Sequence, residues 1–410
     1  MRLIIKNIGK LLLHEHESRP WVAGGDMSRL SQLDDAWLVL EDEKIDCFGQ
    51  GEVIPFTDDE VMDAQGGYVM PAFCDSHTHL VYAGSREKEY EDKIRGLSYE
   101  EIAKRGGGIL NSARLLQNTS EEELYLQSVP RVMEIMRMGT GAVEIKSGYG
   151  LTVQDELKML RVIRRIGETF PLKVVSTFLG AHAVPEAFKP DPDKYVDLIV
   201  KEMIPAVAGE GLADYIDVFC DKGFFTVPQT ERILEAGAKF GLPPKIHANE
   251  LDFSGGIQTG VKFHARSVDH LEFTGDKEIK RLKSSETMPT LLPGASFFLG
   301  IGYAPARQLI DEGLPVALAS DFNPGSSPSG NMEFIMSLGI IKLKMLPEEV
   351  IHAVTLNGAY AMGLERTHGS VCPGKAANLI ITKPVPSVGY IPYYYGASVV
   401  DKVLIGGKVV

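Results

Sequence analysis

The chain has 410 residues, with 42 Lys and Arg against 55 Asp and Glu, so its formal net charge is −13. Hydrophobic residues make up 44% and charged residues 24%, a balance typical of folded globular proteins and not of disordered ones. The acidic balance argues against a nucleic-acid-binding protein, which needs a basic surface, and it requires a local cation to hold any anionic substrate.

Neither a membrane span nor an export signal is predicted. No apolar run approaches the roughly 18 residues that a membrane helix needs. The opening segment interrupts its apolar residues with Lys6, Asn7 and Lys10 and has no small-residue cleavage site. The four cysteines lie far apart without a C-x-x-C pair, which argues against a disulfide framework or a zinc ribbon. We therefore expect a soluble, cytoplasmic protein.

Short strands are predicted at both ends of the chain. LIIKN, AWLVLED and KIDCFG lie in the first 65 residues, and ANLIIT and DKVLIGGKVV lie in the last 40. Neither end could bury a core alone, so we expect the two ends to pair into one small β-sandwich domain. Its two parts are predicted to be residues 1–68 and 361–410.

Between these ends, in residues 69–360, β-type runs alternate with helix-type stretches. The predicted strands are residues 69–80, 142–147, 173–182, 215–221, 244–250, 266–271, 287–294 and 315–321. One helix-type stretch, 120–139, begins with Ser120 three residues before Glu123, the spacing of a capping box. Eight strands in this alternation predict an α/β fold of the (β/α)₈ TIM-type barrel. A doubly wound open sheet is the alternative, although such sheets usually have five or six strands.

Polar side chains gather at the predicted strand ends, where the active sites of such barrels lie. They are His77, His79, Lys146, His182, Asp221, His247, His270 and Asp321, and they include five of the ten histidines. His77 and His79 project from the same face of a strand, so their imidazoles can share one divalent metal. Together with His247 and Asp321 they form a three-imidazole, one-carboxylate set that suits zinc or iron and leaves a position for water.

Two further residues are candidates for moving protons. His270 is either a fifth ligand or, as we favour, a group that holds or deprotonates the attacking water. Glu250, three residues past His247, is a candidate proton shuttle, with a solvated loop acid as the alternative. A carbamylated two-metal centre would need a lysine on the inner face of the fourth strand. Lys222 lies one residue beyond Asp221 and is therefore misplaced for that role, so we expect one metal ion per chain.

The segments around these residues resemble the amidohydrolase superfamily and, within it, the imidazolonepropionase family. PAFCDSHTHL is similar to the superfamily's first-strand signature, and Asp321 matches its aspartate at the eighth strand. The segments similar to imidazolonepropionases are HTHLVYAGSREKEY (77–90), EIKSGYGL (144–151), FLGAHAVP (178–185), KIHANE (245–250), VDHLE (268–272) and SDFNPGSS (320–327). The resemblance covers the whole barrel and extends into the flanking β-domain.

The resemblance implies hydrolytic ring opening of 4-imidazolone-5-propanoate to N-formimidoyl-L-glutamate, a step of histidine degradation, by a metal-dependent hydrolase acting on C–N bonds of cyclic amides. The implied metal ligands are His77, His79, His247 and Asp321. The implied contacts to the propanoate and the ring are Arg86, Tyr149, His182 and Glu250, and those to the glutamate-like end are Asn323, Gly325 and Ser326. Because members of the family often form dimers, a homodimer is expected.

The chemistry of three residues agrees with these implied contacts. Arg86 lies on the first loop, where its planar guanidinium could grip a carboxylate, although a surface ion pair with Glu87 or Glu89 is the alternative. Tyr149 is flanked by glycines that let the backbone turn sharply and present the side chain to the site, with a packing tyrosine as the alternative. His182 could donate a hydrogen bond to the ring carbonyl or be a core histidine.

The sequence leaves the general base open among Glu250, His270 and Asp321. Two positions depart from the family pattern: Asn249 stands where an acidic residue is frequent, and Ser320 stands where a threonine is common. Neither is an implied ligand, so these departures do not argue against metal binding. They leave open how the basicity of the metal centre is tuned.

Two other functions are compatible with parts of this pattern. A mononuclear deaminase acting on an aromatic ring or nucleobase would share the metal ligands but would not need Arg86 to hold a carboxylate. An inactive barrel that serves as a binding protein would be expected to lack one or more ligands, and here all four are present.

Overall fold

The computed structural model describes residues 2–97 and 107–410. Within these residues one sheet has eight parallel strands, each paired with the next along the chain from β6 to β13. The strands are β6 (Phe73–Thr78), β7 (Thr140–Lys146), β8 (Lys173–Ala181), β9 (Tyr215–Cys220), β10 (Pro244–Ala248), β11 (Ser267–His270), β12 (Met288–Leu291) and β13 (Ala317–Leu318). The circle closes where Thr78 forms a parallel bridge with Phe322, and the backbone N–H of His79 donates to the Phe322 carbonyl at 2.9 Å. This is the predicted barrel.

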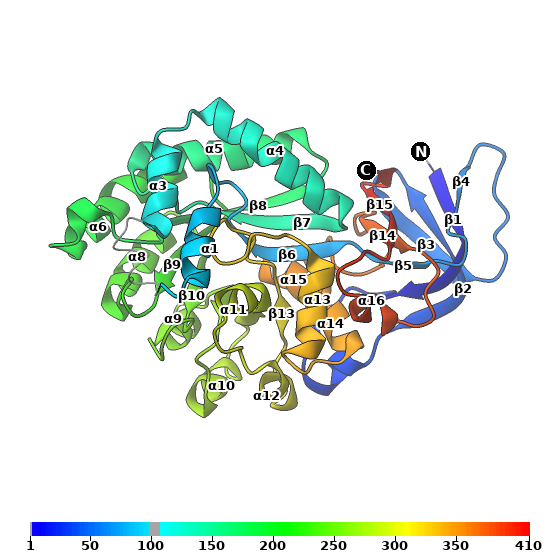
Figure 1. The fold of residues 1–410 in the computed structure, drawn as a ribbon. Helices are drawn as coiled ribbons and strands as arrows, with labels where there is room; N and C mark the ends of the chain where they lie inside the picture. The colour runs from blue at the N-terminus through cyan, green and yellow to red at the C-terminus, as the bar shows by residue number, and fades with distance from the viewer. Residues whose placement is uncertain (1, 98–106) are drawn as a thin grey trace.

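Helices cover the outside of the barrel (Figure 1). Those described are α1 (Glu87–Ile94), α3 (Ile109–Gln117), α4 (Glu121–Arg137), α5 (Val153–Thr169), α6 (Pro192–Leu198), α7 (Ile204–Gly209), α8 (Val227–Lys239), α9 (Gly256–Lys262), α10 (Asp276–Leu282), α11 (Pro293–Leu299), α12 (Ala306–Asp311), α13 (Met332–Ile341), α14 (Pro347–Val354), α15 (Leu356–Ala361) and α16 (Tyr390–Tyr393). The Ser120 hydroxyl caps α4 by accepting from the Glu123 N–H at 3.2 Å, as its spacing predicts. No described helix is both long enough and apolar enough to cross a membrane.

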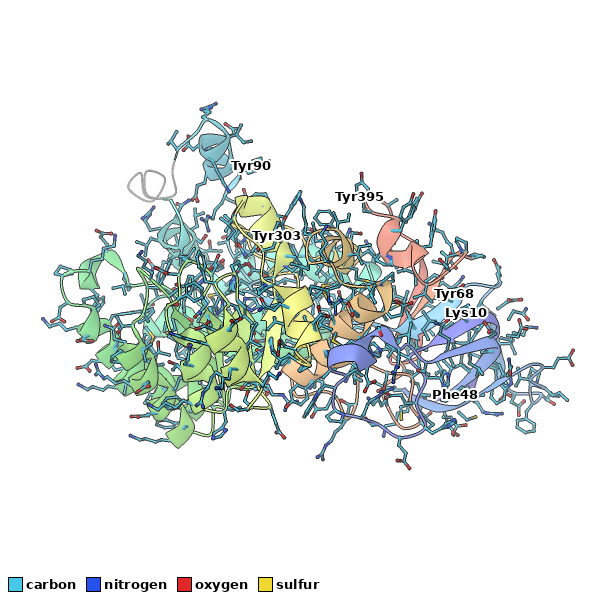
Figure 2. The ribbon with its side chains drawn as sticks, turned by 90° about the horizontal axis from the view of Figure 1, so that it is seen from below. Lys10, Phe48, Tyr68, Tyr90, Tyr303 and Tyr395 are labelled. Carbon is cyan, nitrogen blue, oxygen red and sulfur yellow. The ribbon has the colours of Figure 1, made fainter. Side chains whose placement is uncertain are left out.

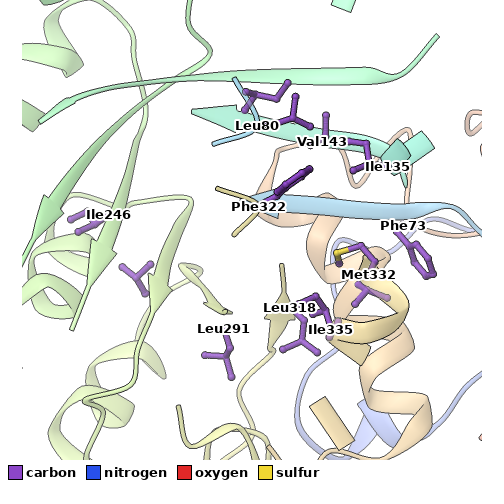
Figure 3. Close-up of a cluster of buried hydrophobic side chains, with 14 of the residues drawn as sticks. Phe73, Leu80, Ile135, Val143, Ile246, Leu291, Leu318, Phe322, Met332 and Ile335 are labelled. Atoms are coloured by element: carbon purple, nitrogen blue, oxygen red, sulfur yellow. The ribbon is translucent and has the colours of Figure 1, made fainter. Parts of the chain in front are cut away.

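The main core lies between the barrel strands and their helices. Strands β6 to β13 are almost fully buried on both faces, which explains why they appear in the sequence as apolar runs without strict alternation. Figure 3 shows Phe73 and Val143 of the strands in one cluster with Ile135 of α4 and Ile335 of α13. This packing holds the carboxyl ends of the strands in fixed positions.

A second sheet combines strands from both ends of the chain, as predicted. Its strand order is β16-β15-β14-β5-β1-β2-β3, with β4 paired to β1. The strands are β1 (Arg2–Leu12), β2 (Gln32–Glu41), β3 (Lys44–Gln50), β4 (Glu60–Asp63), β5 (Tyr68–Pro71), β14 (Leu379–Thr382), β15 (Val400–Ile405) and β16 (Lys408–Val409). Its own apolar core includes Ile5, Leu38 and Leu379. In Figure 2, Lys10, Phe48 and Tyr68 lie in this small domain, away from Tyr90 on α1.

The run predicted as a single strand at 69–80 is divided between the two sheets. Met70 in β5 pairs with Ile380 of the small domain, whereas Phe73 in β6 pairs with Thr140 of the barrel. Both parts are buried, so the apolar pattern continues across the change of sheet and does not reveal it. The last predicted strand, 315–321, is shorter than expected, because only Ala317–Leu318 pairs as a strand. The domain limits at residues 68 and 360 stay predictions.

Candidate active site

Three histidines converge at the carboxyl ends of β6 and β10. One ring nitrogen from each of His77, His79 and His247 lies within 4.8 Å of the others, and all three side chains are buried. The Nε2 atoms of His79 and His247 are 3.3 Å apart. His77 and His79 face the same side because they are two residues apart on an extended segment. The structure therefore brings together the three imidazoles that the sequence predicts as metal ligands.

Asp321, the fourth predicted ligand, lies beside this cluster. Its Oδ1 atom is 3.6 Å from His77 Nε2 and 3.7 Å from His79 Nε2. Its N–H donates to the His77 carbonyl at 3.0 Å. Asp75 holds the preceding residue, because its carboxylate accepts from the Ser320 hydroxyl at 2.5 Å and from the Ser320 N–H at 2.9 Å. Ser320 therefore performs an orienting task that a threonine hydroxyl could also perform.

Two aspartates orient two of the imidazoles from below. Asp269 Oδ2 lies 2.6 Å from His77 Nδ1, and Asp217 Oδ2 lies 2.9 Å from His247 Nδ1. Since an ionised carboxylate only accepts, each Nδ1 carries a proton and each Nε2 keeps its lone pair.

These nitrogens fit a divalent metal ion. His77 Nε2 is buried and has no hydrogen-bond partner among the described residues. Burial holds the pKa of His77 and that of His79 well below the ordinary histidine value, so both rings are neutral and able to act as ligands. Converging lone pairs of buried neutral imidazoles, with a carboxylate beside them, form a donor set typical of zinc or iron.

A cavity of about 430 Å³ opens above the histidines. Its lining includes His79, Arg86, Tyr149, His182, Phe219, Phe224, His247, Glu250, His270, Asp321, Asn323, Gly325 and Ser326. One wall is apolar, with the rings of Phe219 and Phe224 stacked at 4.0 Å between centroids. A planar ring can be held against such a wall while its polar groups face the other side.

Glu250 and His270 face each other in the cavity. Glu250 Oε2 lies 3.7 Å from His270 Nε2, and Glu272 lies 3.7 Å from the other ring nitrogen of His270. Asp221 fixes the Glu250 loop by accepting from the Glu250 N–H at 2.7 Å. Burial raises the pKa of Glu250 to about 7 against the opposing effect of His270. Burial lowers the pKa of His270, but Glu250 and Glu272 outweigh it and raise the value to about 10.

Arg86 combines the two roles considered for it. Its Nε donates to Glu89 Oε2 at 2.8 Å, and its side chain is only 10% exposed and lines the cavity. The guanidinium lies against the backbone of Gly325, where an added Cβ would overlap it. Gly325 therefore provides the space that Arg86 occupies.

His182 is stacked on His79, with 4.9 Å between ring centroids and 11° between planes. Its Nδ1 is 3.1 Å from the Gly148 carbonyl, which can only accept, so Nδ1 carries the proton. Burial, together with His247, lowers the pKa of His182 to about 3. The neutral ring then offers Nε2 as an acceptor and not as the donor that we expected.

Tyr149 is 2% exposed and lies 5.3 Å from His182 between ring centroids. Its loop is held by the buried carboxylate of Glu156 on α5, which accepts from the N–H groups of Gly148 at 3.1 Å, Gly150 at 2.8 Å and Leu151 at 2.9 Å. Gly148 has a positive φ of 111°, a conformation that favours glycine.

The turn after Asp321 is held by its own hydrogen bonds. Asn323 donates to the Asp321 carbonyl and to the Ser326 hydroxyl, both at 2.7 Å, and it accepts from the N–H groups of Gly325 and Ser326. The Ser326 hydroxyl in turn donates to Asp321 Oδ2 at 3.2 Å. Asn323, Gly325 and Ser326 line the cavity, and Asn323 shapes the turn; their contacts to substrate stay predictions.

Comparison with known proteins identifies the family. Residues 228–410 match the sequence model of the Amidohydrolase family. The chain is 54% identical over 411 residues to the imidazolonepropionase of Christiangramia forsetii and 55% identical over 411 residues to that of Flavobacterium johnsoniae, and each alignment covers 100% of both chains. The chain belongs to the imidazolonepropionase family.

Solved structures show how widely the fold of this imidazolonepropionase-family chain is shared. E. coli guanine deaminase has a TM-score of 0.75 at 14% identity and covers 100% of this chain and 99% of its own. A 5-methylcytosine deaminase from Klebsiella pneumoniae has a TM-score of 0.75 at 18% identity, covering 100% and 97%. At these identities the likeness is one of fold, and it does not favour deamination over the family's reaction.

Sequence reasoning assigns no role to several residues beneath the imidazolonepropionase-family site. These are Asp75, Glu144, Lys146, Asp217, Lys245 and Asp269. The available signal is a charged residue inside an otherwise apolar strand, as in YIDVFC. Since such a charge is costly to bury without a partner, each one indicates a partner inside the barrel.

Proposed function

We propose that this chain opens the ring of 4-imidazolone-5-propanoate by hydrolysis, giving N-formimidoyl-L-glutamate, in the cavity above His77, His79 and His247. The observation that carries the proposal is one cavity that holds a buried imidazole cluster and a guanidinium, in a chain with full-length imidazolonepropionase relatives. A deaminase of nucleobases would have no carboxylate for Arg86 to bind.

The residues that would hold the metal are His77, His79, His247 and Asp321. When bound there, zinc or iron would supply a water molecule whose pKa is lowered towards about 7 and a positive charge beside the reacting carbonyl. Asp269 and Asp217 keep His77 and His247 in the tautomer that this task requires.

Arg86 would hold the propanoate of the substrate. Its guanidinium donates in a planar fork that matches a carboxylate, and it provides the local cation that a chain of net charge −13 requires. Its ion pair with Glu89 holds the guanidinium in place. His182, which lines the same cavity, would accept a hydrogen bond at Nε2 from a ring N–H of the substrate.

Glu250 is our choice among the three candidates for the general base. Its carboxylate would take a proton from the water that attacks the carbonyl carbon of the ring. The C–N bond then breaks, and Glu250 would return the proton to the departing ring nitrogen, so that the carboxyl and formimidoyl ends of the product are formed. Its raised pKa, near 7, suits both transfers. His270, paired with Glu250, would stabilise the ionised carboxylate.

The decisive experiment follows the ultraviolet absorbance of freshly generated imidazolonepropanoate with metal-loaded protein and with Arg86→Ala. We expect rapid loss of the chromophore and formation of N-formimidoyl-L-glutamate, with the variant showing a KM raised by at least tenfold. Loss no faster than the spontaneous rate, in protein that holds about one metal ion per chain, would contradict the proposed reaction. Release of ammonia from cytosine or guanine would then favour a deaminase.

That the protein is cytoplasmic and that it forms a homodimer both stay predictions.

A further inference from the structure

A cluster of five charged side chains lies directly beneath the histidines, and we call it the buried charge cluster. It consists of Glu144, Lys146, Asp217, Lys245 and Asp269, each no more than 1% exposed. None of the five lines the cavity, so the cluster does not contact a bound substrate. Charges buried this deeply are costly unless their arrangement compensates them.

Lys146 lies at the centre of this cluster. Its Nζ is 2.6 Å from Glu144 Oε1, 2.9 Å from Asp217 Oδ2 and 3.6 Å from Asp269 Oδ2. The two aspartate oxygens are the same atoms that face the imidazoles, since Asp217 Oδ2 lies 2.9 Å from His247 Nδ1 and Asp269 Oδ2 lies 2.6 Å from His77 Nδ1. One ammonium group therefore contacts both carboxylate oxygens that orient two different ring nitrogens.

We propose that Lys146 is a positioning residue for the metal centre, and that its ammonium group holds the carboxylates of Asp217 and Asp269 in place against His247 and His77. This inference rests on the proposed function, because it concerns the affinity of the proposed ligands for their ion.

The physical reason is the placement of each imidazole. Asp217 and Asp269 lie on different strands, and Lys146 contacts one oxygen of each. Without this shared contact each carboxylate can turn away from the ring nitrogen that it faces, and the imidazole loses a support on the side opposite its metal-binding nitrogen. Removal of Lys146 should therefore weaken two ligands together.

The neighbouring Lys245 does not make these contacts. It forms an ion pair with Glu144 and donates to the Ser76 carbonyl at 3.2 Å. Among the described residues, the ion pairs that join a lysine to Asp217 or Asp269 are those of Lys146.

The test measures metal binding and not only catalysis. Zn²⁺ dissociation constants are measured by competition with a chromophoric chelator, and the visible d–d spectrum of Co²⁺-loaded protein reports the ligand geometry. The variants are Lys146→Met, Asp217→Asn, Asp269→Asn and the double variant Lys146→Met with Asp217→Asn. The matched control is Lys375→Met, which removes a lysine that is also 1% exposed but donates to the His368 carbonyl outside the barrel.

We expect each Asn variant to weaken Zn²⁺ binding by about 10-fold and Lys146→Met by about 100-fold, because losing one residue that orients a ligand typically costs about 10–100-fold in affinity. The Co²⁺ spectrum should change in Lys146→Met and not in Lys375→Met. The double variant should bind no more than about threefold more weakly than Lys146→Met alone, since both act through the same contacts.

Three results would overturn the inference. They are an unchanged Zn²⁺ affinity and Co²⁺ spectrum in Lys146→Met, an equal loss of Zn²⁺ affinity in Lys375→Met, or losses of affinity that multiply in the double variant.

If Lys146→Met does not fold, the double variant, in which one cation and one anion are removed together, is compared with Asp217→Asn. Equal affinity of those two would also overturn it, and weaker binding by the double variant would support it. Wild-type protein that binds no metal would instead refute the proposed metal centre, and this inference with it.

Discussion

Glu250 illustrates how the placement of one side chain determines its chemistry. The same residue type on a solvated loop would be ionised at neutral pH and a weak base. Here burial raises its pKa to about 7, while Asp221 fixes its backbone and His270 faces its carboxylate. A carboxylate prepared in this way can accept and return a proton within one turnover.

The pH dependence of kcat/KM should report this residue. Only the ionised form of Glu250 accepts a proton, so kcat/KM should rise with pH through about 7 and fall below it. Glu250→Gln should lower kcat by about 10²–10⁴-fold and remove that acid limb. Steady-state kinetics from pH 5.5 to 8.5 test this, with metal content measured in parallel. An intact acid limb in the variant would assign the base to another group.

Gly325 is expected to matter through Arg86 and not through its own contacts. Gly325→Ala places a methyl group where the guanidinium lies, so Arg86 must move. The KM should rise by about tenfold or more, with a smaller change in kcat, because a hydrogen bond to a charged group contributes about 1.5–3 kcal/mol. Gly302→Ala is the control, since a Cβ there would meet nothing within 4 Å. A KM equal to that of Gly302→Ala would contradict this role.

At the scale of elements, the start of α5 supports the loop that carries Tyr149. The carboxylate of Glu156 accepts three backbone N–H groups of this loop, and burial raises its pKa. A helix that is anchored by its apolar face on the barrel thus fixes a loop at the cavity.

Glu156→Gln should therefore destabilise the protein. An amide has one acceptor oxygen in place of two, and its NH₂ would face an N–H group that needs an acceptor. The free energy of unfolding should fall by about 1–3 kcal/mol. Urea unfolding measures it, with the exposed Glu168→Gln on the same helix expected to change stability by no more than about 0.5 kcal/mol. Equal effects of the two variants would show that the three contacts are not stabilising.

At the scale of the whole molecule, the fold and the metal centre depend on different contacts. The core is apolar and distributed along the barrel, whereas the histidines occupy one end of it. The protein without metal should therefore keep its secondary structure and lose its activity.

Removing the metal with a chelator should abolish ring opening while leaving the far-ultraviolet circular dichroism unchanged. The thermal midpoint should fall by a few degrees, because an ion at 100 times its Kd stabilises the fold by about 2.7 kcal/mol. Adding back zinc or iron should restore both properties, and the relative rates would show which ion supports catalysis. Full activity in protein shown by elemental analysis to be metal-free would contradict the proposal.

The sequence predicted the residues whose spacing carries chemistry and missed those whose role depends on three-dimensional contacts. His77 and His79 could be predicted because they occur together with His247 and Asp321 at predicted strand ends. Arg86 could be predicted because its segment resembles those of imidazolonepropionases. The role of Lys146 could not be predicted, because the two aspartates that it contacts come from other strands. The change of sheet at Ala72 was hidden because both sides of it are buried.

The small domain has a consequence for how the protein folds during synthesis. Strand β5 pairs with β14, which begins more than 300 residues later. It leads almost directly into β6, which contains His77 and is followed by His79. Until Leu379–Thr382 has left the ribosome, one edge of β5 has no partner. Pairing at such a separation is slow, and an unpaired edge can associate with other chains. Completion of the small domain is thus tied to the synthesis of Leu379–Thr382, whereas every proposed metal ligand precedes this strand in the chain.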